Sequence, residues 1–255
     1  MMKVCVLASG SEGNCTYIET DRHKILVDLG TTVKYIKNKL EEIDVNIMDI
    51  DYVIISHVHD DHVKALKTFT NKYDATILVT KKMLDELPVL RDYGNIIVYD
   101  DDIYLDGLKI NVIKTSHDAS DSRSFVFSSG GKSVAYITDT GYLNQRYFRI
   151  LSNLDVYLFE SNHDVELLMN GAYPEWLKKR IVGASGHLSN KDASIYLAKL
   201  VGGNTKKIIL THLSKKNNRE ELALETINSV FLEYGVKFKN IACARQDEKS
   251  EIIVL

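Results

Sequence analysis

Three histidines and an aspartate lie within six residues of one another at the end of the segment VIISHVHDDH, residues 53–62. The four residues are His57, His59, Asp61 and His62. Imidazole and carboxylate groups are common protein ligands of zinc, manganese and iron. Such a cluster next to an apolar strand would be electrostatically costly without a cation. The pattern therefore predicts a metal site.

Three further candidate ligands, His117, Asp139 and His212, each follow a predicted strand. A single histidine or aspartate in that position is more often a hydrogen-bonded residue than a ligand. Ligand sites in α/β proteins nevertheless gather beyond the carboxyl ends of strands, so these segments can converge on the cluster. Seven groups are too many for one tetrahedral site. We therefore expect two divalent ions (zinc, manganese or iron), bridged by the two carboxylate oxygens of Asp139.

Strands and helices alternate along the chain and would position these residues. The apolar pattern predicts strands at 3–8, 16–19, 24–29, 52–56, 76–80, 96–99, 103–105, 108–115, 124–127, 133–138, 156–159, 207–210, 241–244 and 251–255. It predicts helices at 33–43, 63–69, 81–87, 175–182, 189–201 and 219–234. With two prolines and no linker-like stretch, residues 1–255 are expected to form a single α/β domain.

The composition excludes some classes of protein. Lys and Arg number 32 against 35 Asp and Glu, so no overall basic field indicates a nucleic-acid partner, although a local groove could still supply one. The N-terminus turns polar after six residues and no long apolar stretch follows, so we expect a cytoplasmic protein without a membrane partner. The three cysteines, Cys5, Cys15 and Cys243, lack CxxC spacing and are interpreted as small core residues.

The motif His57-x-His59-x-Asp61-His62, followed by His117, Asp139 and His212, resembles that of the metallo-β-lactamase superfamily. Asp28 matches the aspartate at the end of an early strand in that family. The resemblance implies a four-layer αββα sandwich with the site at one edge between the two sheets. Many true β-lactamases have a cysteine where this chain has Asp139, which points away from antibiotic hydrolysis.

A finer resemblance is to the YycJ-like (WalJ-type) branch, bacterial proteins regarded as DNA exonucleases and related to RNase Z. It rests on the segments SGSEGN at 9–14, HDA at 117–119, ESNHD at 160–164 and GHLSN at 186–190. The segment Ser122-Arg123-Ser124 departs from the apolar, proline-containing segment that is usual there.

The expected mechanism is phosphodiester hydrolysis by a hydroxide that two metal ions activate. We assign His57, His59 and His117 to one ion, Asp61, His62 and His212 to the other, and Asp139 to both. Asp61 can also orient the nucleophile or accept its proton.

Residues outside this ligand set are expected to handle the substrate. In RNase Z-like relatives a glutamate and a histidine pair, which implies that Glu160 and His187 stabilise charge or protonate the leaving oxygen, although His187 could instead only stabilise its loop. We place His163, Ser189 and Asn190 at the substrate, with packing beside the site as the alternative for His163. The loop 9–14 is expected to be structural.

Residues that could hold a nucleic acid follow later in the chain. Basic side chains flank Gly186 and His212, at Lys178, Lys179, Arg180, Lys191, Lys215, Lys216 and Arg219. Tyr142, Tyr173 and Trp176 could stack on bases. Solvated helix faces are the alternative for the basic residues.

Three function classes follow from these residues. A metal-dependent DNA exonuclease is the leading hypothesis. A hydrolase of small phosphodiesters or thioesters, and a non-catalytic metal-bound regulatory module, are the alternatives. The sequence leaves the oligomeric state open.

Overall fold

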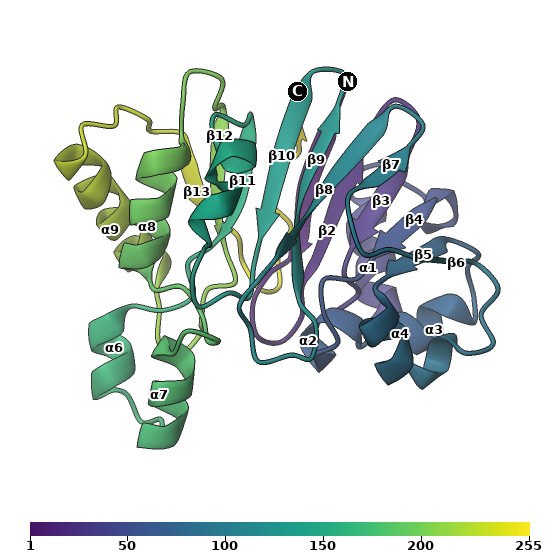
Figure 1. Cartoon of the computed structure of the whole chain (residues 1–255), viewed down its shortest axis with the longest axis horizontal. Coiled ribbons are helices and arrows are strands. Elements are labelled where there is room, and N and C mark those ends of the chain that lie inside the picture. The colour runs from purple at the N-terminus through teal and green to yellow at the C-terminus, as the bar shows by residue number, and fades with distance from the viewer.

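Two seven-stranded β-sheets lie face to face, and helices cover the outer surface of each (Figure 1). The structure is a computed structural model that describes residues 1–255. The first sheet contains, in spatial order, β14 (Ile253–Val254), β1 (Lys3–Ala8), β2 (Cys15–Glu19), β3 (Lys24–Val27), β4 (Tyr52–Ile54), β5 (Thr76–Val79) and β6 (Ile96–Val98). The second contains β13 (Ile241–Cys243), β12 (Lys207–Thr211), β11 (Val156–Glu160), β10 (Lys132–Ile137), β9 (Arg123–Ser129), β8 (Leu108–Lys114) and β7 (Ile103–Leu105).

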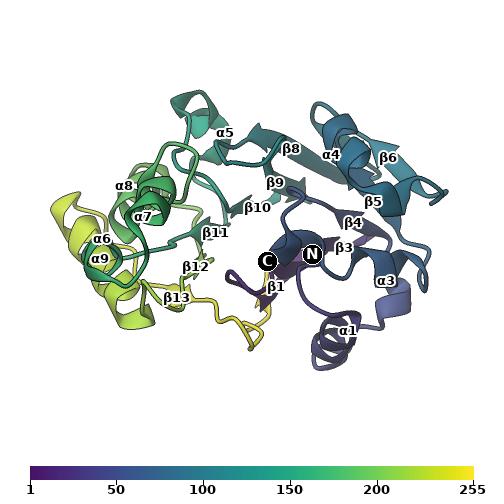
Figure 2. The same cartoon turned by 90° about the horizontal axis from the view of Figure 1, so that it is seen from below.

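The helices lie mainly outside the sheets and at one end of them (Figure 2). They are α1 (Val33–Glu41), α2 (Asp60–Val63), α3 (Leu66–Thr70), α4 (Lys81–Glu86), α5 (Phe148–Leu151), α6 (Val165–Asn170), α7 (Glu175–Val182), α8 (Asn190–Leu200) and α9 (Glu220–Glu233). Short 3-10 turns lie at Ile47–Asp49, Pro88–Leu90 and Gln145–Tyr147. No helix combines the length and the apolar character that crossing a membrane requires.

Three separate apolar cores hold the layers together. In β1, Val4 and Val6 face the second sheet, whereas Cys5 and Leu7 belong to the core under the helices of the first sheet. This alternation follows from the two-residue period of a strand, which allows one strand to fill two cores. A third core lies between the second sheet and helices α8 and α9. The predicted four-layer αββα sandwich is confirmed.

The helix predicted at 63–69 is wrong in its boundaries. The chain forms two short helices there, and α2 begins at Asp60, so that Asp61 and His62 are already helical. The Ala65 amide donates to Leu29 O at 2.8 Å, and Asp61 O accepts from the Asn14 amide at 2.8 Å. A continuous helix would instead join Ala65 N to Asp61 O. Contacts with distant segments therefore replace that bond.

Two short helices lie where the sequence predicted none. Helix α5 has four residues and α6 has six, which is too short for a 3.6-residue apolar period to stand out. The start of α6 carries one local signal, because Asp164 Oδ1 accepts from the Leu167 amide at 2.9 Å as an N-cap. Helix α7 has the predicted limits, 175–182.

Candidate metal centre

The predicted ligands converge at one edge of the sandwich because they follow strands that run in the same direction. Asp28 follows β3, and the cluster at 57–62 follows β4, which is parallel to it. In the second sheet, His117 follows β8, Asp139 follows β10 and His212 follows β12. β8 and β10 are each antiparallel to β9 and are therefore parallel to one another. The carboxyl ends of strands from both sheets meet here, as predicted.

The backbone itself turns three of these side chains inward. Asp28, Asp139 and His212 have φ angles of 63°, 52° and 57°, the left-handed region that non-glycine residues rarely adopt. Asp28 and His212 directly follow β3 and β12, and Asp139 lies two residues after the end of β10. Unfavourable backbone conformations of this kind persist where surrounding contacts enforce them, and they gather at functional sites.

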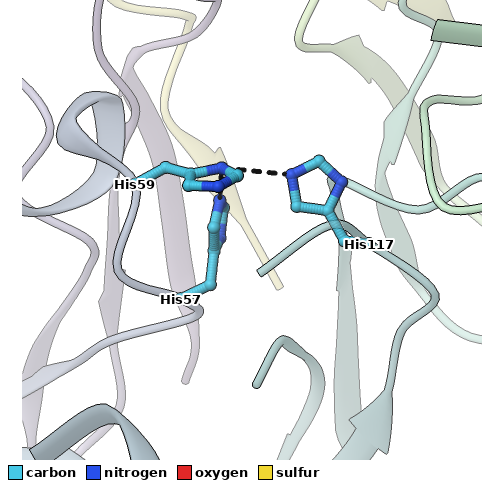
Figure 3. A group of neighbouring side chains, drawn as sticks. All are labelled: His57, His59 and His117. Carbon is cyan, nitrogen blue, oxygen red and sulfur yellow. Dashed lines mark hydrogen bonds between the residues drawn. The ribbon is translucent and has the colours of Figure 1, made fainter. Parts of the chain in front are cut away.

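The first cluster consists of His57, His59 and His117. Figure 3 shows His57 and His59 approaching from one sheet and His117 from the other. His59 Nδ1 lies 3.1 Å from His57 Nε2 and 3.2 Å from His117 Nε2. Burial lowers the pKa of His57 well below its usual range, which favours the neutral imidazole that metals bind. Three ring nitrogens facing one point fit a divalent cation.

The second cluster consists of Asp61, His62 and His212. Asp61 Oδ2 lies 3.5 Å from His62 Nε2 and 3.6 Å from His212 Nε2. The Nε2 atom of His212 is buried and has no hydrogen-bond partner. A buried polar atom without a partner is costly, and a cation would supply the missing partner.

Asp139 lies between the two clusters. Its Oδ2 atom is 3.1 Å from His62 Nε2, and its Oδ1 atom is 3.9 Å from His117 Nε2 and 3.4 Å from His212 Nδ1. Burial alone would lower the pKa of His212, but the charge of Asp139 and the contacts with Asp61 and Glu160 raise it to about 10. The carboxylates thus attract positive charge to this position, which again fits a cation site.

A buried network around Asp28 orients His62. Asp28 accepts hydrogen bonds from the Ser56 amide at 2.7 Å, Ser56 Oγ at 2.7 Å, Tyr136 Oη at 2.9 Å and His62 Nδ1 at 2.8 Å. With its Nδ1 proton on Asp28, His62 presents Nε2 as the ligand atom. The sequence indicated Asp28 through the family resemblance but gave no signal for Tyr136, which reaches across from the second sheet.

The loop 9–14 supports both sides of the second cluster. The Asn14 side-chain amide lies 3.3 Å from Asp61 Oδ2 and 3.0 Å from His62 Nε2. The backbone amide of His212 donates to Ser9 Oγ at 2.7 Å. These contacts agree with the structural role expected of the loop. Asn14 and Ser9 themselves were not among the predicted site residues.

Glu160 and His187 form the pair that the resemblance implied. His187 Nδ1 donates to Glu160 Oε1 at 2.7 Å and lies 3.4 Å from Asp139 Oδ1. Glu160 is fully buried and also accepts from the Thr140 amide at 2.9 Å. Burial alone would raise the pKa of Glu160, but the charge and hydrogen bond of His187 lower it. His187 is partly exposed, so its free edge can reach a ligand.

The predicted substrate contacts His163, Ser189 and Asn190 lie behind this pair, and all three are buried. Ser189 Oγ accepts from the Asp192 amide at 3.1 Å as the N-cap of α8. The side chain of Asn190 bonds Ser161 and Asn218. Both ring nitrogens of His163 lack hydrogen-bond partners. Contact of these three residues with a substrate stays a prediction.

Two sequence interpretations change in the structure. Lys178 is not on a free basic surface, because it is buried and its Nζ atom donates to Met169 O at 2.7 Å. Arg123, in the segment 122–124, is also buried and forms an ion pair with Asp121. Its backbone amide donates to Ser56 O at 2.9 Å. The segment therefore fixes the end of β4, just before His57.

Comparison with known sequences gives a consistent assignment. The model of the metallo-beta-lactamase superfamily matches residues 8–212. The chain is 36% identical over 237 residues to exodeoxyribonuclease YycJ of Bacillus anthracis, covering 90% of this chain and 89% of that protein. It is 38% identical over 248 residues to exodeoxyribonuclease WalJ of Streptococcus pneumoniae, covering 93% and 92%. These matches confirm the resemblance to that branch.

Solved structures share the architecture. The metallo-beta-lactamase fold protein YhfI from Bacillus subtilis superposes with a TM-score of 0.74 at 17% identity, over 98% of each chain. A diphosphatase of the PhnP family gives 0.68, also at 17% identity and over 98% of each chain. At these identities the likeness concerns the fold alone. The fold and the histidine and aspartate clusters indicate binding of divalent metal. This chain belongs to the metallo-β-lactamase superfamily.

Proposed function

We propose that this protein is a metal-dependent phosphodiester hydrolase that acts as a DNA exonuclease, with residues 1–255 forming one catalytic domain. The observation that carries the proposal is the pair of ligand clusters that meet at Asp139, in a chain whose relatives along most of its length are named exodeoxyribonucleases. DNA as the partner and a cytoplasmic location are parts of the same proposal.

The ligand sets support two divalent ions, zinc, manganese or iron. His57, His59 and His117 would hold one ion, and Asp61, His62 and His212 the other, with Asp139 shared. Metals bound there would supply a nucleophilic hydroxide near neutral pH and neutralise charge on the phosphate. Asp61 is more exposed than Asp139, the shared carboxylate. Asp61 is therefore placed to orient that nucleophile.

His187 is the proposed general acid. Its Nδ1 proton is held by Glu160 at 2.7 Å, which leaves Nε2 to carry a proton toward the leaving oxygen. Glu160 fixes the orientation of the imidazole through this contact, as the buried aspartate does in serine hydrolases. His163, Ser189 and Asn190 would support the substrate side of this pair.

The test is digestion of 5′- and 3′-labelled DNA by the metal-loaded protein. Chelation and Asp61→Ala should each abolish cleavage, and His187→Ala should slow it about 10²- to 10⁴-fold. Asp60→Ala is the matched control, because Asp60 is the exposed neighbouring carboxylate that belongs to no ligand cluster. It should retain activity.

Other outcomes would assign the protein to a different class. Turnover of a thioester without phosphodiester cleavage would refute the nuclease assignment. Metal binding without turnover of any tested substrate would favour a regulatory module.

A further inference from the structure

Helices α6 and α7 form an arm that projects from the sandwich at the end where α2 lies (Figure 1). The arm carries exposed apolar side chains that none of the three cores covers: Val165, Met169, Trp176 and Val182. Trp176 is 67% exposed. A large aromatic side chain left exposed in this way is unusual and commonly marks a binding surface.

The face of α7 that bears Trp176 also bears Arg180, which pairs with the residue next to His117. Trp176 and Arg180 are four residues apart in a helix, so their side chains lie on the same face, one turn from each other. Arg180 forms an ion pair with Asp118, whose Oδ1 atom is 3.5 Å from His117 Nε2. Trp176 therefore lies about one helical turn, roughly 6 Å along the axis, from the residue that pairs with Asp118 beside the metal centre.

The loop that follows α7 attaches the arm to the same edge. Gly186 O lies 3.3 Å from His117 Nδ1. Gly141 packs so closely on this loop that a Cβ atom there would lie 2.3 Å from Ala184 O. Tyr142, the next residue, is 45% exposed. Two exposed aromatic side chains thus flank the loop that leads to His187.

Positive charge accompanies these aromatic side chains. Lys179 is exposed on α7, beside Arg180. Lys216 Nζ lies 5.6 Å from the ring centroid of Tyr173, in the link between α6 and α7. Aromatic side chains combined with lysines along a path to the site are the features by which proteins bind single-stranded nucleic acid without sequence preference.

We propose that the α6–α7 arm binds the single-stranded DNA next to the scissile phosphodiester, with a base stacked on Trp176 and the backbone near Lys179 and Lys216. This inference rests on the proposed nuclease function and names its substrate form. Stacking on Trp176 needs a base whose face is free, and in a duplex the neighbouring pairs cover both faces of all but the terminal bases. The arm therefore favours single-stranded DNA, in which every base has a free face, over a duplex, which offers only its terminal bases.

Trp176 is the only tryptophan in the chain, so its fluorescence reports the arm alone. The experiment titrates metal-chelated protein, which leaves the DNA uncut, with oligo(dT). We expect saturable quenching that weakens steeply with salt, and much weaker quenching by a blunt duplex of equal length. Absence of quenching at concentrations where a labelled oligo(dT) binds by anisotropy would overturn the assignment.

Substitutions provide a second measurement. Trp176→Ala should weaken oligo(dT) binding and raise KM for single-stranded DNA on the order of 10-fold. Hydrolysis of bis(p-nitrophenyl) phosphate, which is too short to reach the arm, should not change. Tyr104→Ala is the matched control, because Tyr104 is an aromatic residue on β7 that is 71% exposed. Equal KM for the wild type and Trp176→Ala would also overturn the proposal.

The two proposals fail separately. Quenching by oligo(dT) without any DNA cleavage by the metal-loaded protein would refute the nuclease function and leave the binding surface in place. Cleavage of single-stranded DNA without quenching would refute the binding surface and leave the nuclease function in place.

Discussion

Removal of the Tyr136 hydroxyl should weaken metal binding without touching a ligand. Tyr136 Oη donates to Asp28 Oδ2 at 2.9 Å, and Asp28 in turn holds His62 Nδ1 at 2.8 Å. Tyr136→Phe keeps the ring that packs between the sheets and removes only this bond. Burial and the nearby charge of Asp28 raise the pKa of Tyr136 well above its usual value, so the hydroxyl remains a donor over the working pH range.

The size of the effect follows from the charge of the acceptor. A hydrogen bond to a charged group contributes about 1.5–3 kcal/mol, and Asp28 would keep its three bonds from Ser56 and His62. Loss of a group that orients a ligand typically costs about 10- to 100-fold in metal affinity. We therefore expect metal affinity to fall by a factor within this range, with most of the loss at the cluster that contains His62.

The assay is metal content after dialysis against buffers of graded free metal concentration, together with urea unfolding of the chelated protein. Tyr157→Phe is the matched control, because Tyr157 is also a buried tyrosine in the second sheet, and its hydroxyl donates to Leu151 O at 2.7 Å, far from any ligand. It should lose stability but not metal affinity. Equal metal affinities for the two variants would refute the reasoning.

Two further predictions concern the backbone and the thiols. Gly30→Ala should lower the free energy of unfolding by about 3 kcal/mol or more and release metal, because the added Cβ atom would lie 1.6 Å from Asp61 O. Gly94→Ala is the control, since its Cβ atom would meet nothing within 4 Å, and it should change neither quantity. Thermal unfolding and metal analysis measure the two effects. Burial and the charge of Glu220 raise the pKa of Cys243 to about 12, so only about one thiol in 10⁴ is ionised at pH 8. Iodoacetamide should therefore label it only after unfolding; labelling of the folded protein at the rate of a free peptide thiol would contradict this.

Local patterns in the sequence were sufficient for most elements. Strands such as β1 and β11 consist almost entirely of apolar residues. Helices α7 and α9 lie between residues that are typical of helix ends. Helices α5 and α6 were missed because they are too short for an apolar period to stand out, whereas the boundary error at 63–69 fell where distant contacts override the local pattern. The break between α2 and α3 comes from bonds to Asn14 and Leu29, which no local periodicity records.

The sequence by itself determined which groups could bind metal, because His57, His59, Asp61 and His62 lie within six residues and carry their chemistry wherever the strand places them. Only the tertiary structure decided how these groups are divided and oriented. Tyr136 and Asp28 are 108 positions apart in the chain, and Asn14 and Asp61 are 47 apart. These hydrogen bonds form only where folding brings distant segments together, and the packing of the two sheets places Asp139 between the clusters.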